Sequence, residues 1–313
     1  MTVPETMRAL LQTSWEGPQD MRLIDDATVP SPGPGEVLVR VVVAGVNFAD
    51  ISKSHGTFGD GPRPPYLAGF EGAGEVVAVG EGVDVARLGT RVVGVGDGAF
   101  AEYLVLSAVA AVPVPPGWTE RQALGLTVNW PTALAALRPL GGVSAGQTVL
   151  IHAAAGATGQ AAVTIAKHYG ATVIATSSPA KHERVLALGA DYVVDSRRDD
   201  LAAEVSRLTG GTGVDVVLES AGGGTFEAGL AVAKRVTGRV VVYGAAGGDA
   251  SITNWELIYK HQVHLIGFNL GVLIQAAPQT FGEVMGELFA LIGAGVIEPA
   301  QPVVHDLADG QKV

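Results

Sequence analysis

A run of small residues between two apolar segments has the composition of a phosphate-binding turn. The apolar residues 149–151 predict a buried strand, residues 153–159 a tight loop, and residues 160–169 a helix that ends at Gly170. The N–H groups at the start of such a helix, with the helix dipole, favour a bound anion such as a pyrophosphate. The spacing is Ala-x-x-Gly-x-x-Gly rather than Gly-x-Gly-x-x-Gly, so an ordinary strand-to-helix turn is the alternative.

The context of this loop favours a dinucleotide site, because a second apolar segment at residues 172–176 completes a β-α-β unit. Gly156 would let the loop pass close to the phosphates, and Gly159 would let the helix pack against the sheet. The residues predicted to contact the pyrophosphate are Ala155, Gly156, Ala157, Thr158 and Gly159.

The residues after the second strand of this unit indicate which nicotinamide coenzyme binds. An enzyme that uses NAD usually has Asp or Glu there, which binds the ribose 2′-hydroxyl. This chain has Ser177, Ser178 and then Lys181. Hydroxyls and a lysine can bind a 2′-phosphate that a carboxylate would repel, so we predict NADPH rather than NADH. In the structural alternative, Ser178 caps a helix and Lys181 is a solvated surface residue.

The composition of the 313-residue chain is that of a globular protein with a large core. Hydrophobic residues make up 48% of it and charged residues 16%, and it has no cysteine, which excludes disulfides and thiolate metal sites. The net charge of −11, without a cluster of Lys or Arg, argues against binding to nucleic acid or an anionic membrane. No apolar segment approaches the roughly 20 residues of a membrane span, and no signal peptide is visible, so we expect a cytoplasmic protein.

Two regions with different hydrophobic periodicity predict two domains. Residues 8–125 contain many short β-type segments separated by Gly and Pro, which predicts a mostly β, partly open barrel. From residue 149 onward, apolar strand segments alternate with helical ones, which predicts a doubly wound parallel sheet of the Rossmann type. The expected fold class is therefore α/β, with a barrel domain in addition to the Rossmann domain.

The order of these regions resembles that of the medium-chain dehydrogenase/reductase superfamily over nearly the whole chain. Residues 45–50 (Gly-Val-Asn-Phe-Ala-Asp), residues 69–74 (Gly-Phe-Glu-Gly-Ala-Gly) and the loop at 153–159 are similar to motifs of its zinc-independent quinone oxidoreductase branch. Each motif alone is modest, but together they are specific.

The resemblance implies a particular domain organisation. It implies a GroES-like barrel domain that binds the substrate at residues 1–126 plus 269–313, a Rossmann domain at residues 127–268, and a cleft between them that holds NADPH. The apolar helical stretch at residues 281–297 then belongs to the barrel domain. Relatives continue with a further helix and strand, so residues from Asp306 onward are expected to lead into such a segment.

Zinc-containing alcohol dehydrogenases are also similar to this sequence, but they have a Cys where Asn47 stands and a His where Phe70 stands. A catalytic zinc needs three N, S or O ligands and an open position, and Asn47 and Phe70 cannot supply two of them. The seven histidines show no spacing typical of metal ligands. We therefore predict a zinc-free site. Without a Lewis acid the oxidation of an alcohol is difficult, whereas a conjugated acceptor delocalises the incoming charge itself.

The expected chemistry is hydride transfer to an electrophilic carbon, for which the protein mainly aligns two rings. By the resemblance, Asn47 and Asp50 lie near the nicotinamide and Thr132 contacts its carboxamide. The residues that the resemblance places at the nicotinamide end, from the side of the sixth strand, are Gly244, Phe268, Asn269 and Leu270. In the structural alternatives, Asn47 is a turn residue and Asp50 is a charge at a helix N-terminus.

Tyrosines that relatives often carry are missing from this chain. Soon after the Asn-Phe-x-Asp segment, relatives often have tyrosines where this chain has Ser52 and Phe58, and Tyr66 aligns with an aromatic wall residue. No general acid is evident, so we expect either that solvent or a bound water protonates the product, or that electron transfer to a quinone needs no fixed acid. Reductases of this kind also often have a tyrosine after the third Rossmann strand, where this chain has Ser196 followed by Arg197. Arg197 can take the place of the tyrosine, and an ordinary surface arginine is the alternative.

Three functions stay open. The first is an NADPH-dependent, zinc-free reductase that transfers hydride to a quinone or a similar conjugated carbonyl acceptor. The second is an enoyl reductase that acts on an α,β-unsaturated ketone or thioester in a biosynthetic pathway. The third is a catalytically silent NADPH-binding protein with a structural or sensory role. By the resemblance we also expect a homodimer formed through the sixth strand, residues 263–268, although a buried strand has the same composition.

Overall fold

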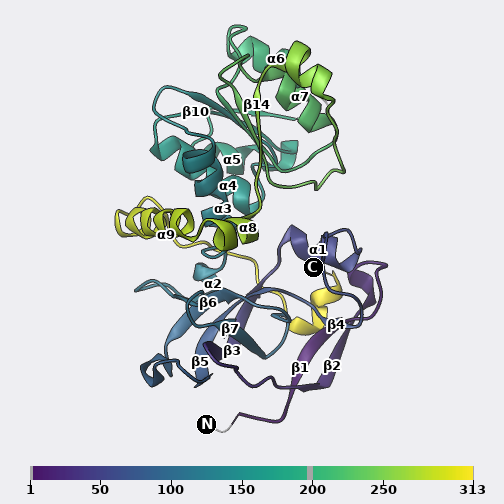
Figure 1. Ribbon diagram of the computed structural model, residues 1–313, viewed down its shortest axis with the longest axis vertical. Helices are drawn as coiled ribbons and strands as arrows, with labels where there is room; N and C mark the ends of the chain where they lie inside the picture. Colours follow the sequence, from purple (N-terminus) through teal and green to yellow (C-terminus); the bar gives the residue numbers. More distant parts are fainter. Residues whose placement is uncertain (1–2, 196–199, 313) are drawn as a thin grey trace. The chain divides into compact units, whose positions relative to one another are not determined.

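The computed structural model describes residues 3–195 and 200–312 and divides into two compact units (Figure 1). The first unit comprises Met1–Val128 and Pro299–Val313, and the second comprises Asn129–Glu298. Each unit has its own sheets and its own apolar core.

The first unit contains two antiparallel sheets. The five-stranded sheet has the order β7 (Tyr103–Ser107), β3 (Glu36–Gly45), β5 (Glu71–Val79), β6 (Arg91–Val95) and β8 (Val112–Pro113). The three-stranded sheet has the order β2 (Met21–Thr28), β1 (Thr6–Gln12) and β4 (Tyr66–Leu67). Across the described residues these strands form a GroES-like sheet domain without closing into a complete barrel, which agrees with the partly open barrel expected from the sequence.

The apolar and β-branched side chains of this unit account for its core. Val37 and Val39 of β3, Val76 of β5 and Leu104 of β7 are buried in one cluster, because alternate strand residues face the same side of the sheet. The helical segments of this unit are short: η1 (Pro18–Asp20), α1 (Phe48–Ser54), η2 (Val85–Arg87), α2 (Glu120–Ala123) and η6 (Leu307–Lys312). The C-terminal segment η6 contacts β1, β2 and η1 and is therefore part of this unit.

The second unit contains a six-stranded parallel sheet, as the alternation of apolar strands and helices predicted. Its order is β11 (Tyr192–Val194), β10 (Thr172–Thr176), β9 (Thr148–Ile151), β12 (Val216–Glu219), β13 (Arg239–Val242) and β14 (His264–Gly267). The strand order reverses between β9 and β12, which is the point where open sheets of this kind bind ligands outside the carboxyl ends of their strands.

Helices connect these strands. They are α3 (Asn129–Ala135), η3 (Ala136–Leu140), α4 (Ala157–His168), η4 (Pro179–Lys181), α5 (His182–Ala187), α6 (Leu201–Leu208), α7 (Gly224–Val232), η5 (Glu256–His261), α8 (Leu270–Ala276) and α9 (Pro278–Gly293). The helices α3 and α4 contact each other, as do α6 and α7. Buried strand residues such as Leu150, Ile174 and Val217 form the core with α6 and α7.

The last long helix, α9, packs within the second unit rather than with the barrel-like sheets. It contacts α3, and its buried residues are Val284, Leu288 and Leu291. On its polar side, Glu287 accepts a hydrogen bond from the hydroxyl of Tyr169. The division at Pro299 thus differs from the boundary expected at residue 269, because the periodicity of α9 reveals an apolar face but not the surface that covers it. Within the described ranges, none of the helices is both long and apolar enough to cross a bilayer.

Candidate functional site

The turn between β9 and α4 presents backbone N–H groups at the carboxyl edge of the parallel sheet. Gly156 is the N-cap of α4, which begins at Ala157. The N–H groups of Ala157, Thr158 and Gly159 belong to the first helical turn, where no acceptor within the helix is available. Together with the positive end of the helix dipole, such N–H groups favour a bound anion.

The two glycines of this turn differ in how much space surrounds them. A Cβ atom on Gly159 would lie 2.6 Å from Cα of Ala154, so α4 can start this close to the loop only with glycine at this position. A Cβ atom on Gly156 would have one protein neighbour within 4 Å, the carbonyl oxygen of Ala153 at 3.3 Å. Packing within the described chain therefore leaves Gly156 room for a side chain, and that room is available to a ligand.

The loop itself is held in place by hydrogen bonds from α4 and from β10. The carbonyl of Ala155 accepts a hydrogen bond from Nε2 of Gln160 at 2.7 Å. Oγ1 of Thr176, at the end of β10, accepts a hydrogen bond from the N–H of Ala153 at 3.3 Å, and the carbonyl of Thr176 accepts one from the N–H of Ala154 at 2.9 Å. Such preorganisation lowers the entropic cost of binding a ligand.

The segment after β10 carries the residues predicted to bind a 2′-phosphate. Ser178 occupies the N-cap position of η4, as in the structural alternative, but its side chain makes no capping hydrogen bond. Ser177 is half-buried and Lys181 is exposed. These donors fit a phosphate, and no carboxylate stands among them. Arg197, the possible substitute for a tyrosine, lies outside the described residues.

The remaining predicted coenzyme residues lie at the carboxyl ends of β13 and β14. Gly244 follows β13, and a Cβ atom there would lie 2.6 Å from the carbonyl oxygen of Ser220. Phe268 follows β14, and Asn269 is the N-cap of α8, where its Oδ1 accepts a hydrogen bond from the N–H of Val272 at 3.1 Å. Leu270 begins α8. The predicted residues of the second unit, apart from Thr132 in α3, therefore gather at one edge of its sheet.

A buried histidine–glutamate pair at the same edge was not predicted. Nε2 of His152 lies 3.6 Å from Oε2 of Glu219, both side chains are fully buried, and Nδ1 of His152 lies 3.3 Å from Oγ1 of Thr176. Burial lowers the pKa of His152, which favours its neutral form. Glu219 also accepts hydrogen bonds from the N–H groups of Ala221 and Gly222 at 2.6 and 2.8 Å. The contacts of the pair therefore connect the ends of β9, β10 and β12.

In the first unit, Asn47 and Asp50 stand at the start of α1. Asn47 is the N-cap and Asp50 the third helical residue, and Oδ2 of Asp50 accepts a hydrogen bond from the N–H of Asn47 at 2.9 Å as part of a capping box. The structural alternative therefore holds for both residues. Their contact with the nicotinamide stays a prediction.

Glu71 connects this helix start to a distant part of the chain. Its Oε2 accepts a hydrogen bond from Nδ2 of Asn47 at 3.0 Å, and its Oε1 accepts one from the N–H of Gly125 at 2.6 Å. Only 2% of Glu71 is exposed. The sequence analysis gave Glu71 no role, although it lies within one of the motifs. A carboxylate inside a glycine-rich apolar strand is the signal that can mark such a residue.

Burial changes the acidity of both carboxyl groups. Desolvation raises the pKa of Asp50 from 3.8 to about 7, against smaller opposing effects of the Asn47 hydrogen bond and the charge of Lys53. Desolvation also raises the pKa of Glu71, although hydrogen bonds from Asn47 and Gly125 oppose it. Near neutral pH, Asp50 can therefore exchange a proton.

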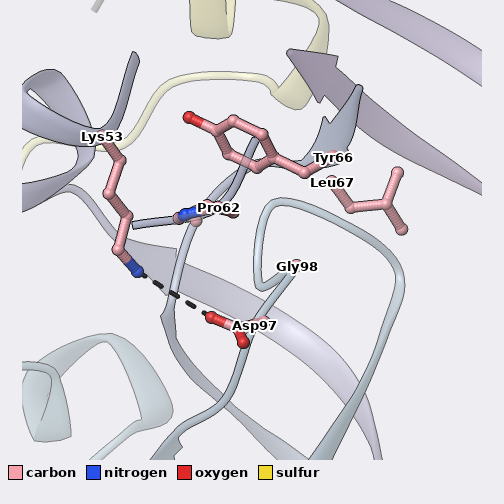
Figure 2. Close-up of a pocket in the computed structure, with 7 residues that line it drawn as sticks. Lys53, Pro62, Tyr66, Leu67, Asp97 and Gly98 are labelled. Carbon is pink, nitrogen blue, oxygen red and sulfur yellow. Dashed lines mark ion pairs between the residues drawn. The ribbon is translucent and has the colours of Figure 1, made fainter. Parts of the chain in front are cut away.

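Two cavities open beside α1 in the first unit. The first, of about 240 Å³, is lined by Lys53, Pro62, Tyr66, Leu67, Gly69, Asp97 and Gly98 (Figure 2). The second, of about 300 Å³, shares Lys53 and Pro62 and is otherwise lined by Trp15, Gly56, Phe58, Gly59, Asp60, Gly61 and Arg63. The sequence analysis did not single out Lys53, since no motif marks it.

Comparison with known proteins gives the family. Residues 33–116 match the alcohol dehydrogenase GroES-like domain, and residues 157–290 match the zinc-binding dehydrogenase family. The structure is similar to that of Escherichia coli quinone oxidoreductase solved with NADPH (TM-score 0.89, 29% identity, 97% of this chain and 94% of that one). It is also similar to the CurK enoyl reductase (TM-score 0.87, 30% identity, 99% of this chain and 94% of that one). The chain belongs to the medium-chain dehydrogenase/reductase superfamily.

Within this superfamily the chain is of the quinone oxidoreductase type, as its three motifs indicated. It also matches a Mycobacterium tuberculosis protein described as a mycocerosic acid synthase-like polyketide synthase. The two are 34% identical over 98% of this chain, which spans 15% of the length of that synthase.

Asn47 and Phe70 stand where the resemblance places two ligands of the zinc-containing relatives, and both make other contacts in this structure. Asn47 donates its amide to Glu71, and the ring of Phe70 lies 4.5 Å from the ammonium of Lys53. In the part of the chain that the structure describes, no group of three or more His, Cys, Asp or Glu residues is arranged to hold a metal ion.

Proposed function

We propose that this chain is an NADPH-dependent, zinc-free reductase that transfers a hydride to a quinone or a similar conjugated carbonyl acceptor. The observation that carries the proposal is the carboxyl edge of the second unit's sheet. There the first turn of α4 offers free N–H donors, and Ser177, Ser178 and Lys181 follow β10 without a carboxylate. The similarity to a quinone oxidoreductase solved with NADPH supports the same coenzyme.

In this proposal, residues of the second unit hold the coenzyme, which supplies the hydride when bound. Residues 155–159 bind the pyrophosphate through backbone N–H groups. Ser177, Ser178 and Lys181 bind the 2′-phosphate through hydroxyl and ammonium donors. Gly244, Phe268, Asn269 and Leu270 line the nicotinamide end.

Asn47, Asp50 and Thr132 are the proposed contacts of the nicotinamide and its carboxamide. Zinc independence is supported by side-chain chemistry, because an amide already bonded to Glu71 and a phenyl ring replace two zinc ligands. The name of the matching zinc-binding dehydrogenase family describes other members, and the donor set in this chain does not fit that metal.

An enoyl reductase is the second candidate, and a specific observation favours it. The chain is similar to the CurK enoyl reductase and to a part of a polyketide synthase. Addition of hydride to an α,β-unsaturated thioester and reduction of a quinone place the same charge on a conjugated oxygen, so one site can serve either acceptor.

We also propose a homodimer formed through β14. This strand is last in the order of the described sheet, pairs only with β13 there, and has exposed residues. Trp255, Ile258 and Tyr259, just before it, expose large apolar surfaces. Light scattering coupled to gel filtration should give twice the chain mass, and a monomer at all concentrations would contradict the dimer.

A comparison of coenzymes and acceptors tests the proposed function. The protein is mixed with NADPH or NADH and with 1,4-benzoquinone, 9,10-phenanthrenequinone, a 2-alkenal or an enoyl thioester, and coenzyme oxidation is followed by absorbance. We expect oxidation of NADPH with the quinones, and elemental analysis without stoichiometric zinc. Preference for the enoyl thioester would favour the second candidate. Binding of NADPH without oxidation by any acceptor would instead favour the silent, structural or sensory protein.

A further inference from the structure

Lys53 places a positive charge between the two cavities of the first unit. It is the third residue after Asp50, and its side chain lines both cavities. Its ammonium lies 4.5 Å from the centre of the Phe70 ring and 5.5 Å from that of the Phe58 ring. Only 13% of the side chain is exposed. The two aromatic rings thus help to hold the ammonium in place, and most of the Lys53 side chain is buried.

The charge of Lys53 is incompletely neutralised. Its nearest carboxylate oxygen, Oδ1 of Asp97, lies 3.8 Å away, and the Asp97 side chain is 94% exposed (Figure 2). An ion pair of this length with a solvated partner is weak, because water competes for the carboxylate. Burial raises the pKa of Asp50, on the same helix, to about 7, so this carboxyl group is largely protonated below pH 7 and carries only part of a negative charge near it. The ammonium keeps donor capacity for a ligand in the cavity.

The surroundings of Lys53 fit a planar, conjugated molecule with an oxygen at one edge. Figure 2 shows the side chain of Lys53 extending toward Asp97, and Pro62 and the ring of Tyr66 are among the other residues that line the first cavity. Burial raises the pKa of Tyr66, so its phenol keeps its proton. Trp15 and Phe58 line the second cavity. Ring faces and apolar walls can accept an aromatic or enone plane, while Lys53 and Tyr66 offer donors to its oxygen.

We propose that Lys53 is a catalytic residue of the reduction, which donates a hydrogen bond from its ammonium to the carbonyl oxygen of the acceptor. This inference rests on the proposed function and deepens it, since it names the group that stabilises charge where zinc is not used. Preorganised donors act most strongly where charge develops during the reaction.

The step balances as follows in atoms and electrons. When bound, NADPH would supply the hydride with its two electrons to an acceptor carbon, by breakage of a nicotinamide C–H bond, and would be left as NADP⁺. A C–H bond forms, the π electrons of the acceptor shift to its carbonyl oxygen, and this oxygen becomes negative. Lys53 stabilises that oxyanion without forming a covalent bond to it. A proton from solvent then converts the oxyanion to a hydroxyl group.

Variants of Lys53 test the proposal. Lys53→Met keeps the unbranched stem but removes the charge, and Lys53→Arg keeps the charge. We expect Lys53→Met to lower kcat/KM for quinones by about 100- to 1,000-fold, which is the scale of losing one donor to an oxyanion, with unchanged affinity for NADPH. Lys53→Arg should stay within about tenfold of the wild type. Lys312→Met is the matched control and should retain activity, since it removes the charge of an exposed lysine of the same unit that lines neither cavity.

A series of benzoquinones separates an electrostatic role from a structural one. The loss in Lys53→Met should be largest for methyl-substituted quinones, whose reduced oxyanions are most basic, and smallest for chlorinated ones. A purely structural defect would lower all rates by the same factor, and this uniform loss would overturn the proposal. Wild-type rates in Lys53→Met would overturn it as well.

Binding of 4-nitrophenol provides a measurement that does not depend on turnover. Its ionised form is yellow, so absorbance reports whether the protein binds phenolate or phenol. The wild type should bind the phenolate preferentially, and Lys53→Met should lose this preference. If no acceptor is reduced but the phenolate preference depends on Lys53, the proposed function fails while the oxyanion site stands. Equal binding in the two proteins would overturn the site.

Discussion

The candidate sites of the two units are formed by different kinds of chemical group. In the second unit the proposed pyrophosphate site consists of backbone N–H groups at the start of α4, and its residues are consecutive. In the first unit, Glu71 joins residues that lie 24 and 54 positions away in the chain, Asn47 and Gly125. One site follows from local spacing, whereas the other is assembled by folding.

This difference explains which residues can be recognised in each unit. A turn with glycines at fixed positions has a backbone geometry that its own sequence specifies, so residues 153–159 are visible as a motif. A buried carboxylate is recognisable only from the donors around it, and those come from other strands and loops. Substitutions in the two units should therefore have different consequences.

The largest effect is expected at Gly159. Gly159→Val would drive a branched side chain into Ala154 and should lower the free energy of unfolding by about 3 kcal/mol or more, with loss of NADPH binding. Gly156→Ala is the matched variant, because its Cβ meets the protein only at 3.3 Å. It should unfold within about 1 kcal/mol of the wild type but bind NADPH at least about tenfold more weakly. Urea unfolding and fluorescence titration check both. Normal NADPH affinity in Gly156→Ala would contradict the assigned pyrophosphate site.

In the first unit, Glu71→Leu should destabilise the fold by about 2 to 4 kcal/mol. It leaves the amide of Asn47 and the N–H of Gly125 without their acceptor in a buried place. The control is Glu75→Gln on the same strand, whose ion pair with Arg40 is exposed and should matter by less than about 1 kcal/mol. Urea unfolding measures both. Equal losses of stability in the two variants would show that the buried hydrogen bonds of Glu71 contribute no more to the free energy of unfolding than the exposed ion pair does.

A pH dependence is expected from Asp50. Its pKa is raised from 3.8 to about 7 by burial, so between these values the folded protein holds a proton that the unfolded chain has lost. The stability that Asp50 contributes is therefore fully present below about pH 4 and is lost as the pH rises through 7, by at most about 1.4 kcal/mol per pH unit. Asp50→Asn should remove this slope from urea unfolding measured across the window. If the variant keeps the same slope, the pH dependence of stability comes from other groups, and Glu71 is the next one to test.

The smallest effect is expected at Lys181. Because this lysine is exposed, Lys181→Ala should weaken NADPH binding only about fivefold, through loss of one screened contact with the 2′-phosphate, and should leave NADH binding unchanged. Lys312→Ala, in the first unit, is the control. Titrations of both coenzymes at low and high salt provide the measurement. An equal loss for NADH would mean that Lys181 does not recognise the 2′-phosphate.

The sequence by itself determined the alternation of strands and helices in the second unit, the glycine-containing turn between β9 and α4, and the family. These features depend on periodicity and on residues adjacent in the chain, where local geometry is fixed by the backbone. Only the tertiary structure decided that α9 packs on α3, that Glu71 bonds Asn47, and that Lys53 lies against Phe70 between two cavities. Each of these contacts joins residues distant in sequence, and their energy depends on burial and on partners that no local pattern contains.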